Sequence, residues 1–209
     1  MDSFDRLKGF ARVAVVSLLA AGGGGYVHAA GFNRVNIGAP APTFSAKGAD
    51  GKAHRLREYA GRLVVLEWTS PVCPFTAVKY NSGAIQALQR YAAAHQVVWL
   101  SIDTAASDKA GYLTAADARE RIARTHATVT EFLFDMDGRI ARSYGAKTTP
   151  SFFIVDRDGT LAYEGAMDDQ VFADDATGHE YMKSALDDLL AGHRVRASET
   201  RPQGCAIEY

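Results

Sequence analysis

The chain has 209 residues, of which 47% are hydrophobic and 22% are charged, and its formal net charge is −1. This length predicts a single domain with at most a small extension. The apolar fraction is too high for a disordered chain, and the near-neutral charge argues against a protein that binds nucleic acid by neutralising phosphates. The two cysteines, Cys73 and Cys205, are too few for a disulfide scaffold or a four-cysteine zinc site.

The first 29 residues have the pattern of a secretory signal peptide. A basic start precedes a short apolar core, Val13–Ala21, and Val27 and Ala29 then stand at the two positions that a signal peptidase recognises. An uncleaved membrane anchor is the alternative, but the apolar run is too short to span a bilayer comfortably. We therefore expect cleavage near Ala29 and a periplasmic or secreted mature protein without a membrane span. In such an oxidising compartment two cysteines can form a disulfide.

Residues 30–192 are expected to form the folded domain, followed by a polar, irregular tail over residues 193–209. Short apolar or alternating runs predict strands at residues 43–46, 53–56, 63–68, 97–102, 131–134, 151–155 and 160–165. Apolar stripes and capping signals predict helices at residues 74–92, 114–125, 137–144 and 178–191. The first helix is expected to kink at residues 81–83, and Thr114 with Asp117 resembles a capping box. Residues 56–60 suit one helical turn, and residues 103–113 a loop.

The order of these elements predicts an α/β fold. A βαβ unit followed by a ββα unit produces a mixed central sheet with helices on both faces. The last two strands are expected to be antiparallel because a tight turn, Arg157-Asp158-Gly159, joins them. Residues 43–56 add an N-terminal hairpin, since Gly48-Ala49-Asp50-Gly51 is a turn sequence.

Cys73 stands where the first central strand ends and the first long helix begins. Unpaired backbone N–H groups and the positive end of the helix dipole stabilise a thiolate at that position. Because a thiolate is the nucleophile both in disulfide exchange and in peroxide reduction, the position indicates a redox-active cysteine. A buried structural cysteine is the alternative, which the flanking Pro71 and Pro74 make the weaker one.

A set of motifs extends around Cys73 and beyond it. The set comprises Gly38–Phe44, Asp50-Gly51-Lys52, Leu63–Trp68 running into Cys73-Pro74, and Gly145–Asp156. Over about residues 37–191, these motifs make the chain similar to the thioredoxin-like redoxins. It resembles the alkyl hydroperoxide reductase/thiol-specific antioxidant family and the periplasmic thioredoxins. The resemblance implies a thioredoxin-like fold and a cis-proline at Pro150.

The sequence departs from both family patterns near the cysteine. A thioredoxin has Cys-x-x-Cys, whereas Ser70 stands at the first of these positions. A peroxiredoxin has Thr or Ser three residues before its reactive cysteine, which Ser70 fits, but neither Arg139 nor Arg142 belongs to a peroxide-binding motif. Related copper carriers have Cys-x-x-x-Cys-Pro, and Thr69 at the first of these positions disfavours copper. The histidines after the signal show no ligand spacing, so we expect neither a metal nor a cofactor.

Five further residues are candidates for the site. Pro150, if cis, would bring the Thr149 backbone beside the reactive cysteine, where it can pair with a substrate strand; a trans proline opening a strand is the alternative. Glu67 interrupts an apolar strand, and if buried it could pass a proton to the thiolate; alternatively, it faces solvent at the strand end. Trp68 and Phe75 are expected to wall the site or to be core aromatics.

Cys205 lies in the tail and has three possible roles. A flexible C-terminal thiol suits a resolving cysteine that attacks oxidised Cys73. A permanent disulfide between the two would instead close a loop of about 130 residues and stabilise the fold by up to about 5 kcal/mol. An intermolecular disulfide is the third possibility.

Two functions are consistent with these residues. The first is a thiol oxidoreductase in which Cys73 reduces a peroxide or exchanges protein disulfides, and an external thiol then restores the enzyme. The second is a binding module that presents the proline groove to a partner and keeps Cys73–Cys205 as a permanent staple.

Overall fold

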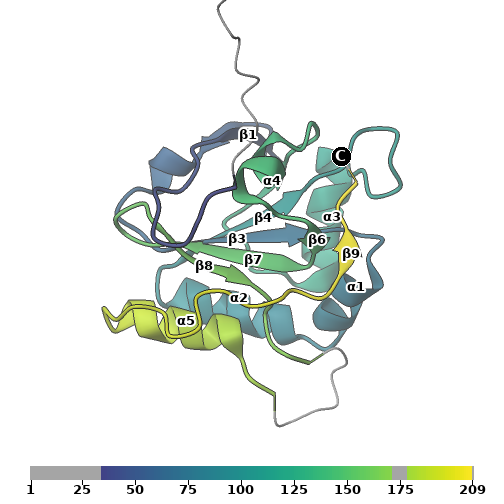
Figure 1. Ribbon diagram of the computed structural model, residues 1–209. Coiled ribbons are helices and arrows are strands. Elements are labelled where there is room, and N and C mark those ends of the chain that lie inside the picture. Colours follow the sequence, from purple (N-terminus) through teal and green to yellow (C-terminus); the bar gives the residue numbers. More distant parts are fainter. Residues whose placement is uncertain (1–33, 171–177, 209) are drawn as a thin grey trace, which may run out of the picture. The chain divides into compact units, whose positions relative to one another are not determined.

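The computed structural model describes residues 34–170 and 178–208 (Figure 1). Seven strands form its central sheet in the order β2-β1-β5-β4-β3-β7-β8. Their bounds are β1 Ser45–Gly48, β2 Ala53–Arg55, β3 Val64–Thr69, β4 Val98–Asp103, β5 Glu131–Phe134, β7 Ser151–Val155 and β8 Leu161–Gly165. The predicted signal peptide lies outside the described residues.

The sheet is mixed, as the order of elements predicts. β3, β4 and β5 run parallel, whereas β7 is antiparallel to β3 and β8 to β7. The predicted N-terminal hairpin is present as β1 and β2, and β1 also pairs with β5, so the hairpin extends the sheet at that edge. β6 (Thr148–Thr149) and β9 (Cys205–Ala206) form a separate two-stranded pair.

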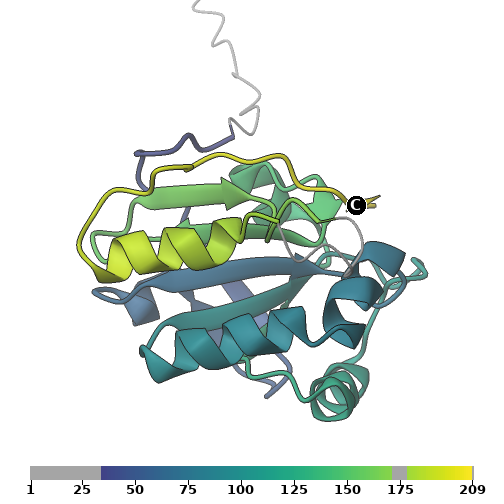
Figure 2. The same ribbon diagram turned by 90° about the horizontal axis from the view of Figure 1, so that it is seen from below.

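Helices cover both faces of the sheet (Figure 2). Their bounds are η1 Leu56–Tyr59, α1 Pro74–Asn81, α2 Ala84–Ala94, α3 Ala115–Thr125, α4 Arg139–Tyr144 and α5 Tyr181–Leu190. Side chains of α2 and α5 pack with Val65 of β3 on one face, and side chains of α4 pack with Leu66 on the other. β3 is therefore apolar without alternation because both of its faces are buried.

The long helix predicted from Pro74 is two helices. Gly83 has φ 79°, in the left-handed region that glycine adopts readily, and it is the N-cap of α2. The predicted kink is thus a complete break between α1 and α2. The capping box of Thr114 and Asp117 is confirmed, because each side chain accepts a hydrogen bond from the other residue's backbone N–H.

Most of the C-terminal tail is irregular, as its polar sequence suggests, but the tail is docked on the rest of the domain. The backbone of Ser198 and Thr200 hydrogen-bonds to Glu164 of β8, and Cys205–Ala206 forms β9 against β6. These are contacts with strands at least 34 residues away in the sequence. The tail itself has no apolar periodicity, so the sequence did not indicate β9, which depends on tertiary pairing.

Within the described part of the chain, no helix combines the length and the apolarity that crossing a membrane requires.

Leu66 provides a test of the central packing. Its side chain is fully buried in the middle of β3. Leu66→Ala should lower the free energy of unfolding by about 2–5 kcal/mol, because it removes buried methyl groups and leaves a cavity. Urea unfolding measures this change. Met136→Ala, at a side chain that is 45% exposed, is the control and should change stability by less than about 0.5 kcal/mol. Equal effects would contradict the packing described.

Candidate thiol redox site

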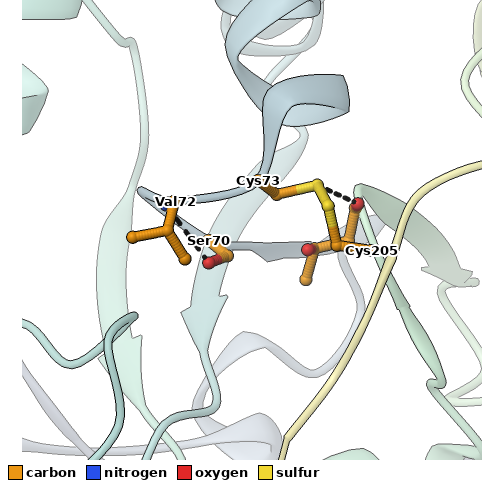
Figure 3. The surroundings of a disulfide bond; sticks show 5 residues. Ser70, Val72, Cys73 and Cys205 are labelled. Atoms are coloured by element: carbon orange, nitrogen blue, oxygen red, sulfur yellow. Dashed lines mark hydrogen bonds between the residues drawn. A yellow bond between two sulfur atoms is a disulfide. The ribbon is translucent and has the colours of Figure 1, made fainter.

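The site begins where β3 ends at Thr69. The chain turns through residues 70–72, and the Val72 N–H donates to Ser70 Oγ at 3.4 Å (Figure 3). Cys73 then takes the N-cap position of α1, and Pro74 occupies the first turn, where its missing N–H costs nothing. Ser70 thus shapes the turn that presents Cys73.

Cys73 is bonded to Cys205 in a disulfide, with their Cα atoms 5.8 Å apart. The bond joins residues separated by 132 positions in the sequence and connects the start of α1 to β9 (Figure 3). Cys73 is 1% exposed, and Cys205 is partly exposed. The pairing is intramolecular, which is one of the arrangements considered above for Cys205.

Thr149 and Pro150 lie directly beside the disulfide. The Thr149–Pro150 peptide bond is cis, as predicted. The Thr149 carbonyl oxygen is 3.0 Å from Cys73 Sγ. A disulfide sulfur carries no proton, so this is a close contact in the oxidised protein, and a reduced Cys73 thiol could donate a hydrogen bond there.

The start of α1 suits a thiolate when the disulfide is reduced. The Cys73 side chain makes no capping hydrogen bond, and the first turn of α1 contains no acidic residue. The free N–H groups of this turn and the helix dipole therefore favour a negative sulfur. A thiolate here is both nucleophile and leaving group in disulfide exchange.

Glu67 is buried, as one interpretation of its position predicts, but its partners lie away from the cysteines. Its carboxylate accepts hydrogen bonds from four side chains, those of Tyr80, Gln89, Trp99 and Ser101. The residue is fully inaccessible to solvent. This network ties β3 to α1, α2 and β4, and a proton-transfer role for Glu67 stays a prediction.

The two candidate aromatic residues lie in different environments. Trp68 is fully buried and packs against Tyr144 and Phe153, with its indole N–H donating to Thr104. Phe75 is partly exposed and lines a small pocket together with Pro150. Trp68 therefore belongs to the core, whereas part of the Phe75 side chain is exposed to solvent beside the cis-proline.

Lys79 of α1 lines the same pocket as Phe75. Its ammonium group contacts Asp168 at 2.7 Å and donates to the Gln170 carbonyl at 2.8 Å. Both charged side chains are nearly buried, so this pair fastens α1 to the segment that follows β8.

Asp103 is a buried acid in the segment that the sequence predicts as a loop. It is the last residue of β4 and lies in register beside Thr69 of β3. Thr69 in turn stands four residues before Cys73. Burial raises the pKa of its carboxyl from 3.8 to about 7, and the charge of Arg121 opposes the rise. In the sequence, the one indication of this site is an acidic residue directly after the apolar run 97–102. The run does not show that the strand continues through Asp103.

The two arginines considered for peroxide binding contact Asp137. Arg139 Nε is 3.0 Å from an Asp137 carboxylate oxygen, and Arg142 donates to the Asp137 carbonyl. Arg139 also lines a cavity of about 810 Å³ between β1 and α4, whose lining includes neither cysteine.

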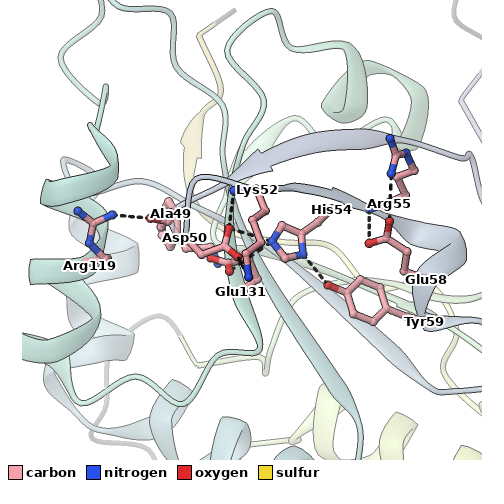
Figure 4. A network of polar contacts seen from close by, with 10 residues as sticks. Ala49, Asp50, Lys52, His54, Arg55, Glu58, Tyr59, Arg119 and Glu131 are labelled. Atoms are coloured by element: carbon pink, nitrogen blue, oxygen red, sulfur yellow. Dashed lines mark hydrogen bonds and ion pairs between the residues drawn. The ribbon is translucent and has the colours of Figure 1, made fainter.

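A second polar cluster lies on the N-terminal hairpin (Figure 4). His54 Nε2 is 3.0 Å from an Asp50 oxygen and 3.4 Å from a Glu131 oxygen, and His54 Nδ1 is 3.2 Å from the Tyr59 hydroxyl. The Lys52 N–H, more than His54, lowers the pKa of Asp50. The side chains of Asp50, His54 and Glu131 are close enough to one another to share a metal ion. Histidine spacing could not reveal the set, because Glu131 comes from a distant strand.

The fold and the cysteine pair define a thioredoxin-like redoxin. The sequence model of the AhpC/TSA family matches residues 37–164, and the chain belongs to that family, whose members are thiol oxidoreductases. This confirms the resemblance on which the expected fold was based. No curated protein matches the chain.

Solved structures share the fold. A hypothetical protein from Sinorhizobium meliloti 1021 has 23% identity and a TM-score of 0.75, covering 85% of this chain and 96% of its own. An uncharacterized conserved protein from Geobacillus kaustophilus has 25% identity and a TM-score of 0.74, covering 85% and 94%. A structure provisionally described as thiol:disulfide interchange protein DsbE from Chlorobium tepidum has 21% identity and a TM-score of 0.54, covering 76% and 97%.

Glu67→Gln tests whether this carboxylate has a structural role. The amide keeps one acceptor but turns N–H groups toward buried donors, so the free energy of unfolding should fall by about 2–3 kcal/mol. The rate at which reduced Cys73 reacts with iodoacetamide should change less than about twofold. Glu120→Gln, at an exposed site on α3, is the matched control and should change neither quantity. A large loss of Cys73 reactivity in a stable Glu67→Gln protein would instead support proton transfer by Glu67.

Asp103 should make stability depend on pH. Its pKa is raised in the folded protein, so the folded state holds a proton that the unfolded carboxyl has already lost above pH 4. The stability from this group is complete below the unfolded pKa of 3.8 and is lost as pH rises to about 7. Asp103→Asn should make the decline smaller in urea unfolding measured from pH 4.5 to 8, and the buried carboxyl of Asp135, whose pKa burial also raises, accounts for part of what is left. Asp137→Asn, at an exposed carboxylate, should keep it. An unchanged decline in Asp103→Asn would assign it to other groups.

Proposed function

We propose that Cys73 and Cys205 form a redox-active dithiol/disulfide pair and that the protein reduces oxidised substrates through Cys73. The observation that carries the proposal is the disulfide between a helix N-cap cysteine and a cysteine on the strand beside cis-Pro150. Ser70 occupies the position of the first cysteine in Cys-x-x-Cys. The second thiol of the pair comes from the tail instead.

Disulfide exchange is the reaction that the site supports best. The Cys73 thiolate attacks one sulfur of a substrate disulfide, forms a mixed disulfide and releases the other substrate sulfur as a thiolate. Cys205 then attacks Cys73 Sγ, which releases the second substrate thiolate and forms the Cys73–Cys205 bond. The backbone of Thr149, next to Cys73 Sγ, supports a polypeptide substrate because it can pair with an extended chain.

Peroxide reduction is the second candidate, which membership of the AhpC/TSA family supports. The Cys73 thiolate would attack one peroxide oxygen, and the alcohol or water would leave with a proton, so that Cys73 becomes a sulfenic acid. Cys205 would then displace water from the sulfenic acid and form the same disulfide. In both routes an external thiol returns two electrons to the pair.

We place the mature protein outside the cytoplasm, in the periplasm or secreted. The predicted signal peptide and the Cys73–Cys205 disulfide support this location, because disulfides persist in oxidising compartments. Its reductant would then be a thiol protein or a small thiol of the same compartment.

Removing each cysteine separately tests the proposal. Reduced Cys205→Ser should accumulate a mixed disulfide when given a protein disulfide substrate, because the resolving thiol is missing. Cys73→Ser is the matched control, since it also removes one thiol, and it should accumulate none and lose substrate reduction on the order of 100-fold or more. Intact-protein mass spectrometry measures the adducts.

A parallel incubation with dilute hydrogen peroxide separates the two routes. A gain of one oxygen at Cys73 in Cys205→Ser, faster than the protein disulfide reacts, would favour peroxide reduction. A Cys73–Cys205 bond that resists mild reductants, with no reaction at Cys73 in either assay, would leave the disulfide as a permanent staple and contradict the proposal.

A further inference from the structure

The strand that carries Cys205, β9, lies along β6 next to Cys73. We propose that residues 201–208 are a removable flap that fills a strand-binding groove in the disulfide form. After reduction, the groove accepts an extended segment of another polypeptide in which glycine precedes the cysteine. This inference rests on the proposed function, because it names the substrate class of the same site.

The flap is held to β6 as a short antiparallel strand. Thr149 is in register with Cys205 and Thr148 with Ala206, and the Ile207 N–H donates to the Lys147 carbonyl at 2.9 Å. β9, drawn in yellow, lies along β6 in Figure 1. Among the described residues, β9 is the strand paired with β6. An incoming substrate strand that pairs with Thr149 as Cys205 does would therefore take the place of β9.

The flap has a firm anchor immediately before it, at Thr200. The Thr200 N–H donates to the Glu164 carbonyl, and its hydroxyl accepts from the Ala166 N–H at 2.9 Å and contacts the Tyr163 hydroxyl at 2.6 Å. Gly165 leaves room for this residue, since a Cβ there would lie 2.1 Å from Thr200 Oγ1. None of these contacts involves the disulfide. Reduction therefore removes the covalent hold on the chain beyond Thr200, leaves only the pairing with β6 and the packing of Ile207 to hold it, and keeps Thr200 in place.

The anchor limits how far Cys205 can move. Four residues separate Thr200 from Cys205, and the five Cα–Cα steps between them span about 17 Å when the chain is extended. Cys205 can thus leave the groove for a substrate strand and still return to Cys73. Its attack on the mixed disulfide stays intramolecular, with the high effective concentration that a short tether provides.

Gly204 indicates what the groove accepts. A Cβ at this position would lie 2.1 Å from the Thr149 carbonyl oxygen and 2.6 Å from its carbonyl carbon, both backbone atoms. Gly204 is not among the glycines with positive φ, so the requirement is for space and not for an unusual conformation. A substrate strand on the same path meets the same carbonyl at the residue before its cysteine. The groove therefore selects Gly-Cys over any other residue followed by cysteine.

Matched peptides test the selectivity. Full-length mature protein with Cys205→Ser, reduced, is mixed with disulfide-linked dimers of two peptides that differ only in Gly-Cys or Ala-Cys. The Cys73 thiolate attacks a dimer, and one peptide thiol leaves as the other becomes bonded to Cys73. The Gly-Cys peptide should form this mixed disulfide about tenfold or more faster, since one methyl group is rejected. Oxidised glutathione serves as a small probe that does not need the groove.

The outcomes separate the inference from the proposed function. Equal rates for the two peptides, with reaction at Cys73, would overturn the groove's selectivity and leave the redox function standing. No reaction at Cys73 with either peptide, with oxidised glutathione or with hydrogen peroxide would overturn both.

Amide hydrogen exchange on the wild-type protein tests the flap itself. On reduction, the Ile207 amide should exchange at least about tenfold faster, whereas the Ala166 amide, bonded to Thr200, should keep its protection. Gly204→Ala should give fast Ile207 exchange even in the oxidised protein, and the control Ala206→Ser, at an exposed side chain next to Cys205, should not. Continued protection of Ile207 in reduced wild-type protein would mean that the tail stays docked and would overturn the flap.

Discussion

The site depends on the position of β3 between two buried neighbours. β4 pairs with it in parallel and β7 in antiparallel register, and both faces are covered by helices. This burial fixes where β3 ends, and hence where Cys73 caps α1. Because β7 begins directly after Pro150, the same register brings the Thr149 carbonyl to Cys73 Sγ. The reactive cysteine and its backbone partner are thus products of one strand arrangement.

The second thiol reaches this point by a route outside the sheet. The tail runs past β8, where Thr200 is bound, and then pairs with β6. A Cys-x-x-Cys motif keeps both thiols on one helix end, so its second thiol stays beside the first in either redox state. Here the second thiol arrives on a strand, and its departure would uncover the groove. The separation of the two cysteines thus couples redox state to access, if the flap moves as inferred.

Much of the site could be predicted from local sequence. Strand, turn and helix signals placed Cys73 at the helix start, and the Thr-Pro motif indicated the cis bond. Burial of Glu67 was one of two alternatives that the sequence left open, and its four hydrogen-bond donors come from three other elements. Asp103 and the cluster of Asp50, His54 and Glu131 were missed, because strand ends and cross-strand proximity are decided by pairing.

The sequence by itself determined the family, the mixed α/β architecture and the helix-start position of Cys73. These follow from local patterns: apolar runs, capping residues and motifs around a single cysteine. Only the tertiary structure decided that Cys205 bonds to Cys73 within one chain and that the polar tail forms a strand. Both depend on contacts between segments at least 34 residues apart, where the tail's path is specified by Thr149, Glu164 and Gly165 and not by its own composition.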